Sequence, residues 1–362
     1  MRDLPSCGWT ERTPIEDSQS FNNAADLVLG ASLHDPEQRR QFSRPITTGR
    51  AENWRLREVT FFPAFSLLFK ENEVIEATRY GGAPNEEDLA RKYLAGHHRH
   101  LEGRRFFIGL NRYCLNYYHI LTQIIPAVAG YELISEFRDG VLLIGSPPPV
   151  LLRGLELAGI QCQETIDLEA GTPLDIDDLT FSSFLCGSNP LSPFSLSVFD
   201  RMIEHTKAPD PKNFCDRRII YVWRADSVGR PMRNEDELVD RLIRNFGVDP
   251  VMLSLLSLDE QIALFRNARL VIGPHGAGLA NIVFCSPGAV LYELLPSHYI
   301  NSGPNHLAQL RGVHYWCDVH KAEAKPGLWR HQTPWVVDIA SVEARLQEII
   351  SSYDIPMRGQ PV

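Results

Sequence analysis

A short polar turn with the sequence HGAG, residues 275–278, carries residue types that bind anions. It follows the apolar run 270–272 and leads into an apolar segment that ends at Cys285, which predicts a strand, a tight turn and a short helix. Glycine lets a backbone approach a ligand closely and take conformations closed to other residues, and the free N–H groups of a helix start attract anions. We therefore predict an anion site in this turn, where His275 adds a donor that can carry charge.

Two simpler interpretations fit the same stretch. Residues 270–292 contain no Asp, Glu, Lys or Arg, and a run of about 20 apolar residues can cross a membrane. Four glycines, two prolines, one histidine and one asparagine argue against a membrane span. The other interpretation is a strand–helix–strand unit that binds no ligand, because buried parallel strands also read as continuous apolar runs. The concentration of glycine around one polar residue favours the anion site.

Asn116 and His119 form a second pair that could do chemistry. Apolar positions with helical spacing run from Leu115 to Val128, and residues three apart share a helix face. From the residues alone, the simpler interpretation is that Asn116 caps this helix and His119 is a hydrogen-bonded core histidine. The alternative is a functional histidine, because an imidazole titrates near neutral pH and can act as a general base.

Arg224 and Arg230 lie in the loop that follows the strand expected at residues 218–223. Loop arginines are usually solvated, but two guanidinium groups beside a glycine-rich turn can bind a diphosphate through paired hydrogen bonds. Three histidines, His97, His98 and His100, invite a metal interpretation, but no carboxylate lies among them and a solvated loop is the better prediction.

Alternating strands and helices must position these loops. The C-terminal half repeats strand and helix, which predicts a doubly wound sheet that binds ligands beyond the carboxyl ends of its strands. Asn234 with Glu237, and Ser257 with Glu260, have the spacing of capping boxes at two helix starts. We divide the chain into an arm at residues 1–53, an α/β domain at 54–206, a second domain at 207–340 that opens with a linker at 207–214, and a helix and tail at 341–362.

Bulk composition limits the class of protein. The 362 residues exceed one typical core and indicate two domains. A net charge of −9 without a dense basic tract argues against nucleic-acid binding. Seven cysteines without a CxxC pair, and an N-terminus without a signal-peptide pattern, favour a reduced, cytoplasmic protein without a transmembrane segment. Peripheral membrane contact and the oligomeric state stay open.

The sequence HGAGLAN at residues 275–281, followed by an apolar helix, a Pro-Gly turn and a strand ending in Glu and Pro, resembles the signature of glycosyltransferase family 61. That family includes bacterial capsular-polysaccharide enzymes and eukaryotic xylosyl- and N-acetylglucosaminyltransferases. The resemblance covers roughly residues 105–316, and Ala280 stands where the family often has Thr. It implies a transferase that moves a sugar from a nucleotide-sugar donor, a UDP-sugar being one candidate, to a glycan hydroxyl, without a further cofactor.

The resemblance also implies roles for particular residues. Asn116 and His119 match an N-x-x-H pattern of the family, which makes Asn116 an acceptor-side residue and favours His119 as the general base of an inverting transfer. His275 is the competing base, although a donor to the leaving diphosphate suits its position better. Glu293 would bind ribose hydroxyls by analogy with other two-domain nucleotide-sugar transferases. The implied donor-binding residues are Arg224, Arg230, Asn234, Glu235, Gly276, Ala277, Gly278, Asn281 and Glu293.

Positive charge in the predicted site argues for a reaction without a bound metal. The nearest match to a metal-binding DxD motif is Asp175-Ile176-Asp177, which we interpret as an acidic turn. Arginines, His275 and a helix start can supply preorganised positive charge instead. We therefore predict no metal and a GT-B-like fold, with two Rossmann-like domains facing a cleft.

Two other functions stay open. A catalytically silent nucleotide-sugar-binding protein would keep the same donor site. A dinucleotide-dependent oxidoreductase shares the strand–helix repeats and glycines, but no GxGxxG follows the first strand of the second domain.

Overall fold

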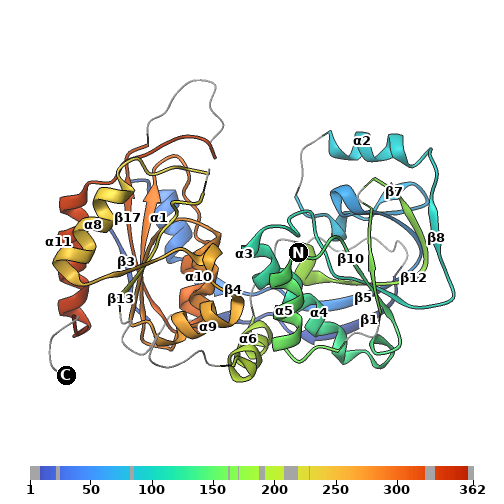
Figure 1. Ribbon diagram of the computed structural model, residues 1–362. Helices are drawn as coiled ribbons and strands as arrows, with labels where there is room; N and C mark the ends of the chain where they lie inside the picture. The colour runs from blue at the N-terminus through green and yellow to red at the C-terminus, as the bar shows by residue number, and fades with distance from the viewer. Residues whose placement is uncertain are drawn as a thin grey trace. The chain divides into compact units, whose positions relative to one another are not determined.

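The computed structural model describes residues 9–21, 25–81, 85–161, 164–169, 171–186, 192–207, 219–227, 229–322 and 331–357. The chain forms two compact units, shown with their elements in Figure 1. The first comprises Met1–Ser20 and Thr47–His205, and the second comprises Phe21–Ile46 and Thr206–Val362. Most of the expected linker, residues 208–214, lies outside the described residues.

The first unit is built on a mixed sheet with the strand order β11-β10-β9-β12-β5-β6-β7, to which β1 adds at β5 and β8 at β12. Strands β9, β10 and β11 are parallel, whereas β5 is antiparallel to both β12 and β6. The strands are β1 (Trp9–Glu16), β5 (Ala51–Phe62), β6 (Leu67–Lys70), β7 (Glu73–Val74), β8 (Arg99–Leu101), β9 (Phe106–Ile108), β10 (Val141–Ile144), β11 (Glu164–Asp167) and β12 (Leu174–Ser182). The parallel part is the Rossmann-like part of this unit.

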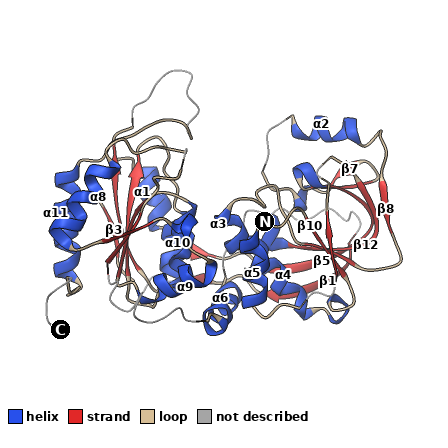
Figure 2. Cartoon of the chain, in the orientation of Figure 1, coloured by secondary structure: helices blue, strands red, loops and turns tan. Residues whose placement is uncertain are grey.

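The helices of the first unit are α2 (Glu86–Tyr93), α3 (Tyr117–His119), α4 (Ile125–Gly130), α5 (Pro149–Leu157) and α6 (Pro193–His205). Helices α4, α5 and α6 contact one another, and α4 also contacts β12. Figure 2 shows these helices gathered beside the sheet, with α2 apart from them. The segment from β9 through α3 and α4 to β10 is therefore a strand–helix–strand unit, and it carries His119.

The second unit is a six-stranded parallel sheet with the order β14-β13-β15-β16-β17-β3. Its strands are β3 (Leu27–Leu29), β13 (Ile219–Val222), β14 (Asp249–Val251), β15 (Leu270–Pro274), β16 (Val290–Pro296) and β17 (His314–His320), and its helices are α1 (Pro36–Ser43), α8 (Glu235–Phe246), α9 (Leu258–Asn267), α10 (Gly303–Arg311) and α11 (Ile339–Ser352). Figure 2 shows α8 and α11 on one face of the sheet, and α1, α9 and α10 on the other. Helices on both faces of a parallel sheet make the unit doubly wound, as predicted.

Burial on both faces explains the continuous apolar runs of the sequence. Every residue of β15 and of β16 is buried. The core on the α8 and α11 face joins strand residues such as Tyr221 and Tyr292 to Leu242 and Leu346 of the two helices. Residues 270–292 are thus strand, 3₁₀ helix and strand rather than a membrane span, and no described helix is long and apolar enough to cross a membrane.

The N-terminal segment supplies strands to both units, and the C-terminal segment contains the expected helix. β1 pairs antiparallel with β5 in the first unit, and β3 pairs with β17 at the edge of the second sheet. Helix α11 packs Val342, Leu346 and Ile349 into the core of the second unit. Each of these segments is therefore part of a folded unit. β1 and β3 add strands to the two sheets, and α11 buries one face in the second unit.

Two predicted caps had different outcomes. Ser257 and Glu260 form the full capping box at the start of α9, as predicted. The predicted cap by Asn234 is wrong, because its side chain makes no capping bond to α8. Asn234 instead pairs with the backbone of Val337, donating to its O at 2.9 Å and accepting from its N at 3.0 Å.

Candidate functional site

In the parallel sheet of the second unit, the order in which successive strands are added changes direction between β13 and β15. The chain runs from β13 outward to β14, then returns to β15 on the other side of β13 and continues to β16 and β17. Ligands of such sheets bind at this switch point, beyond the carboxyl ends of the two strands. Arg224 follows β13, His275 follows β15, and Arg224 Nη1 donates to the His275 carbonyl O at 2.6 Å. The structure thus brings together two residues that the sequence placed on separate loops.

Arg224 is held in one orientation by three side-chain hydrogen bonds. Besides His275 O, its guanidinium donates to Ser227 Oγ at 2.6 Å and to Gly229 O at 2.9 Å. Burial, reinforced by the charge of nearby Arg230, lowers the pKa of Arg224 to about 10. The group stays protonated at neutral pH. Its guanidinium bonds a hydroxyl and two carbonyl oxygens, and the charges of Glu235 and Asp226 also act on it.

Gly276 allows this guanidinium to lie against the turn. A Cβ on Gly276 would meet Arg224 Nη1 at 3.2 Å, and one on Gly278 would meet Leu253 Cδ1 at 2.8 Å. Gly276 has φ of −177°, which is extended backbone that any residue adopts. The expectation of a special backbone conformation is therefore wrong. Both glycines are needed for close packing within the protein, and the 3₁₀ helix Ala277–Phe284 follows directly.

Arg230 approaches the same carbonyl from a different direction. Its Nη2 lies 3.5 Å from His275 O, and its Nη1 donates to His331 Nδ1 at 2.7 Å. The guanidinium carbon lies 4.6 Å from the centroid of the Tyr299 ring, which itself lies 5.2 Å from the His275 ring. Tyr299 and His331 were missed by sequence reasoning because neither belongs to a local motif.

A pocket of about 210 Å³ opens beside the two arginines. Its lining combines Arg224, Arg230 and Arg233 with Glu235 and Asp236. Two guanidinium groups that converge on one carbonyl oxygen repel each other, and burying such charges is costly without a counter-charge. An anion with several oxygens would relieve that repulsion and accept hydrogen bonds from both groups.

Asn234 and Glu235 hold the arginine loop rather than extend into open solvent. Glu235 is buried and accepts from Tyr221 OH at 2.9 Å and from Arg224 N at 3.2 Å. Burial raises the pKa of Glu235. The hydrogen bonds of Glu235 and Asn234 fix the start of α8 and the Arg224 backbone. The expected donor contact of both residues stays a prediction.

His275 belongs to a buried network that includes Glu293. His275 Nδ1 lies 2.6 Å from Glu293 Oε1, and Tyr315 OH donates to Glu293 Oε2 at 2.5 Å. A carboxylate only accepts, so the Nδ1 of His275 carries the proton of this bond. Glu293 is 0% exposed, and its carboxylate orients the His275 ring. Its predicted contact with ribose hydroxyls stays a prediction.

Asn281 also has an internal role. Its side chain is 0% exposed and donates to Gln261 Oε1 at 3.0 Å and to Gly278 O at 3.1 Å. The predicted donor contact of Asn281 stays a prediction. Asn281 ties the 3₁₀ helix to α9, because Gln261 lies on α9 and in turn bonds the loop before it.

His119 ends the short helix α3 in the first unit. Asn116 Oδ1 accepts from Tyr118 N at 3.0 Å, so Asn116 caps α3 as the simpler interpretation held, and its expected acceptor-side role gains nothing from this geometry. A wider π turn, Ile120–Ile124, follows before α4. Pro126 lacks a backbone donor, and π turns occur often at functional sites.

Aromatic rings surround His119. The Tyr113 ring stacks on it with centroids 4.7 Å apart, and Tyr80 and Tyr118 contact it edge-on at 5.7 and 5.5 Å. Burial lowers the pKa of His119 from its ordinary value, and a hydrogen bond to Gln123 opposes part of that effect. The imidazole is therefore neutral at pH 7, which is the form a general base needs.

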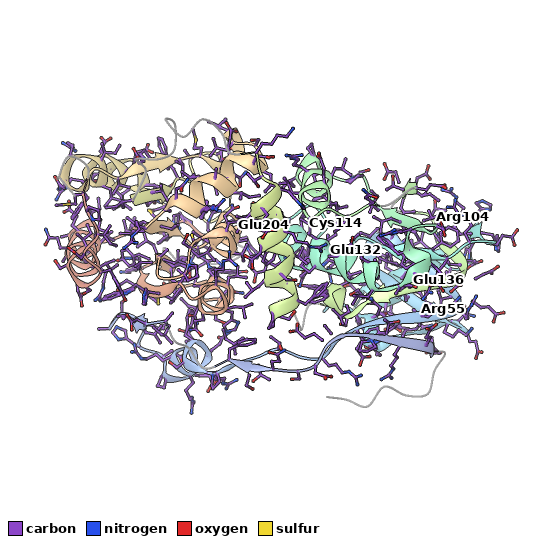
Figure 3. The ribbon with its side chains drawn as sticks, turned by 90° about the horizontal axis from the view of Figure 1, so that it is seen from below. Arg55, Arg104, Cys114, Glu132, Glu136 and Glu204 are labelled. Carbon is purple, nitrogen blue, oxygen red and sulfur yellow. The ribbon has the colours of Figure 1, made fainter. Side chains whose placement is uncertain are left out.

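The acidic segment 175–178 is not the turn that we expected. It lies within strand β12, where Asp175 accepts from Thr60 Oγ1 at 2.7 Å and lies 2.9 Å from His98 Nδ1. Asp178 is held by Arg55, labelled in Figure 3, through two bonds of 2.9 and 2.7 Å. His98 is thus partly buried rather than solvated. Within the described ranges, no three His, Cys, Asp or Glu side chains are grouped to hold a metal ion.

Comparison with known proteins agrees with the central part of this geometry. Residues 117–292 match the glycosyltransferase 61 family model, a range that contains His119, Arg224 and His275. The chain is 36% identical over 127 residues to the EGF domain-specific O-linked N-acetylglucosamine transferase of Drosophila melanogaster, covering 34% of this chain and 23% of that protein. It is 25% identical over 118 residues to the beta-1,2-xylosyltransferase of Arabidopsis thaliana, covering 27% and 22%.

A third relative is the EGF domain-specific O-linked N-acetylglucosamine transferase of Gallus gallus, 34% identical over 94 residues that cover 24% of this chain and 17% of that protein. The matched part of the chain spans less than a quarter of the length of each of these curated relatives.

Proposed function

We propose that this chain is a glycosyltransferase of family 61, whose model matches residues 117–292, and that it transfers a sugar from a nucleotide-sugar donor to a hydroxyl group of a glycan. The observation that supports this proposal most directly is the convergence of Arg224 and Arg230 on the His275 carbonyl at the switch point of the second sheet. Such a site matches a diphosphate, the group that leaves when a sugar is transferred.

We assign the leaving diphosphate to Arg224, Arg230 and His275. The guanidinium groups bind its oxygens. His275 donates a further hydrogen bond from Nε2 when both ring nitrogens carry a proton, because its Nδ1–H already bonds Glu293. No metal ion is needed in this proposal, because fixed positive charge is already present. A requirement for Mn²⁺ would overturn that part of it.

For the acceptor we propose His119 as the general base of an inverting reaction. The acceptor hydroxyl must lose a proton as it attacks the sugar, and a neutral imidazole takes it. This mechanism requires the two units to present His119 and His275 to the same pair of substrates, as in a GT-B arrangement across a cleft. We further propose a cytoplasmic enzyme of capsular or other surface-polysaccharide synthesis.

Isothermal titration calorimetry with UDP, GDP and CDP in EDTA tests the donor site. We expect one nucleoside diphosphate to bind without metal, and Arg224→Ala to abolish most of that binding. Arg244 is exposed on α8, and among the described residues its side chain bonds only Asp240 O, so Arg244→Ala is a matched control. Equal loss of affinity in both variants would contradict the assignment of the site.

A donor panel then tests transfer itself. The names of the relatives point to N-acetylglucosamine and xylose as the first sugars to offer as UDP conjugates. Release of UDP that depends on an added glycan acceptor supports a transferase. Diphosphate binding without release from any sugar donor would instead favour a silent nucleotide-sugar-binding protein.

A further inference from the structure

A chain of hydrogen bonds begins at a backbone amide and ends at the His119 ring. Tyr113 N donates to Asn111 Oδ1 at 2.9 Å, and Asn111 Nδ2 donates to Gln123 Oε1 at 2.8 Å. His119 Nδ1 lies 2.8 Å from the same Gln123 oxygen. Asn111 and Gln123 are each 1% exposed, so solvent does not compete for these bonds.

This chain determines the direction of every bond in it. A backbone N–H can only donate, so the oxygen of the Asn111 amide must face Tyr113 and its NH₂ must face Gln123. The NH₂ of Asn111 in turn requires the oxygen of Gln123 to face it. That oxygen only accepts, and therefore His119 Nδ1 must carry a hydrogen. In a neutral imidazole the lone pair is then on Nε2.

Tyr80 completes the arrangement. Gln123 Nε2 donates to Tyr80 OH at 3.4 Å, and that oxygen lies 3.2 Å from His119 Nδ1, which already carries a hydrogen. Neither neighbour can accept the phenolic proton of Tyr80. Within the described ranges, neither that proton nor His119 Nε2 has another hydrogen-bond partner. Burial raises the pKa of Tyr80, so the phenol keeps its proton.

We propose that Asn111 and Gln123 are positioning residues that hold His119 with hydrogen on Nδ1 and a basic Nε2, and that Tyr80 donates a hydrogen bond to the acceptor substrate. The proposal rests on the function proposed above for His119. It adds that the base acts through Nε2, and that a tyrosine hydroxyl binds the sugar that receives the transferred group.

Few charged groups lie near the His119 ring to oppose the effect of its hydrogen bond to Gln123. Among the residues that the structure describes, the titratable side chains whose rings contact His119 are the phenols of Tyr80, Tyr113 and Tyr118. The cation Arg112 lies over the Tyr113 ring and is paired with Glu86. Hydrogen bonding by Gln123 is thus the interaction that selects the tautomer.

Histidine ¹⁵N NMR on the full chain tests the tautomer without any need for activity. The His119→Gln variant identifies the resonance among the 12 histidines. We expect Nδ1–H in the wild type and a shift toward Nε2–H in Gln123→Met, which keeps the volume but cannot accept in the same way. Thr122→Val alters a neighbouring buried side chain that bonds Tyr118 O at 2.6 Å, and should leave the tautomer unchanged.

The Gln123→Glu variant keeps the shape of the side chain at residue 123 and adds a negative charge beside His119. A carboxylate in place of the amide should raise the pKa of His119 by about 1–3 units and move the acid limb of the rate profile upward equally. Nε2–H in the wild type, or Nδ1–H retained in Gln123→Met, would overturn the proposal. If the wild type transfers no sugar, the proposed function fails while the NMR result still decides the tautomer.

Kinetics with a glycan acceptor test the role of Tyr80. We expect Tyr80→Phe to raise the KM for the acceptor about three- to tenfold, as one neutral hydrogen bond predicts, and to leave UDP affinity unchanged. An unchanged acceptor KM in a folded Tyr80→Phe variant would remove Tyr80 from the proposal.

Discussion

Gly276→Ala should weaken diphosphate binding even though its new methyl group would touch no ligand. The added Cβ would meet Arg224 Nη1 at 3.2 Å and Arg224 Cζ and Nε at 3.3 Å. Such contacts require the neighbour to give by a few tenths of an ångström. The guanidinium is held by three hydrogen bonds, of which the one to His275 O is 2.6 Å long. It must therefore shift by a few tenths of an ångström against these hydrogen bonds.

The size of the effect follows from what Arg224 would lose. One charge-assisted hydrogen bond contributes about 1.5–3 kcal/mol, so misdirecting the guanidinium should weaken nucleoside diphosphate binding by roughly 10- to 150-fold. Backbone strain does not contribute, because φ of −177° at Gly276 suits alanine. Calorimetry with UDP in EDTA measures the change.

Two matched substitutions make this result interpretable. A Cβ on Gly171 would meet nothing within 4 Å, so Gly171→Ala should change neither stability nor affinity. A Cβ on Gly278 would press on Leu253 Cδ1 at 2.8 Å, so Gly278→Ala should lower the melting temperature more than it alters Arg224. A folded Gly276→Ala protein with wild-type affinity for every diphosphate would refute the reasoning.

Other substitutions test the separate roles proposed for the two arginines and the two histidines. Arg224→Ala and Arg230→Ala should each weaken diphosphate binding by about 1.5–3 kcal/mol, measured by calorimetry. Unchanged affinity in both variants would mean that the two arginines have only a structural role in their loop. His119→Ala should lower turnover by roughly 10²–10⁴ and keep UDP affinity, whereas His275→Ala should lose both; the opposite pattern in folded variants would exchange their roles. Because burial lowers the pKa of His119 and the base must be unprotonated, the acid limb of kcat/KM should lie below pH 6.5, and a limb above that value would point to another base.

Local sequence patterns predicted the order of elements from β13 to α11 in the second unit and the loops that carry its chemistry. Apolar runs with short polar breaks are enough for this prediction, because parallel strands buried on both faces consist almost entirely of apolar residues. The same logic placed Arg224 and His275 at the ends of strands. It could not show that β13 and β15 are neighbours, which makes those two ends one site.

Tertiary structure decided the partners of the side chains. Glu293 and Asn281 lie in the recognisable stretch, but packing buries both and turns them toward His275 and Gln261. Tyr299 and His331 join Arg230 from far along the chain, and no periodicity predicts that. The strand β3 reaches its sheet from the opposite end of the sequence.

The physical reason is the range of the forces involved. The spacing of apolar residues and the positions of glycine and proline affect the backbone over only a few residues. The sequence by itself therefore determined where strands, turns and anion-binding residue types occur. The orientation of a buried amide or carboxylate depends on satisfying every hydrogen bond around it at once. For Gln123 that condition involves Asn111 and His119 together, and only the folded chain brings the three into contact.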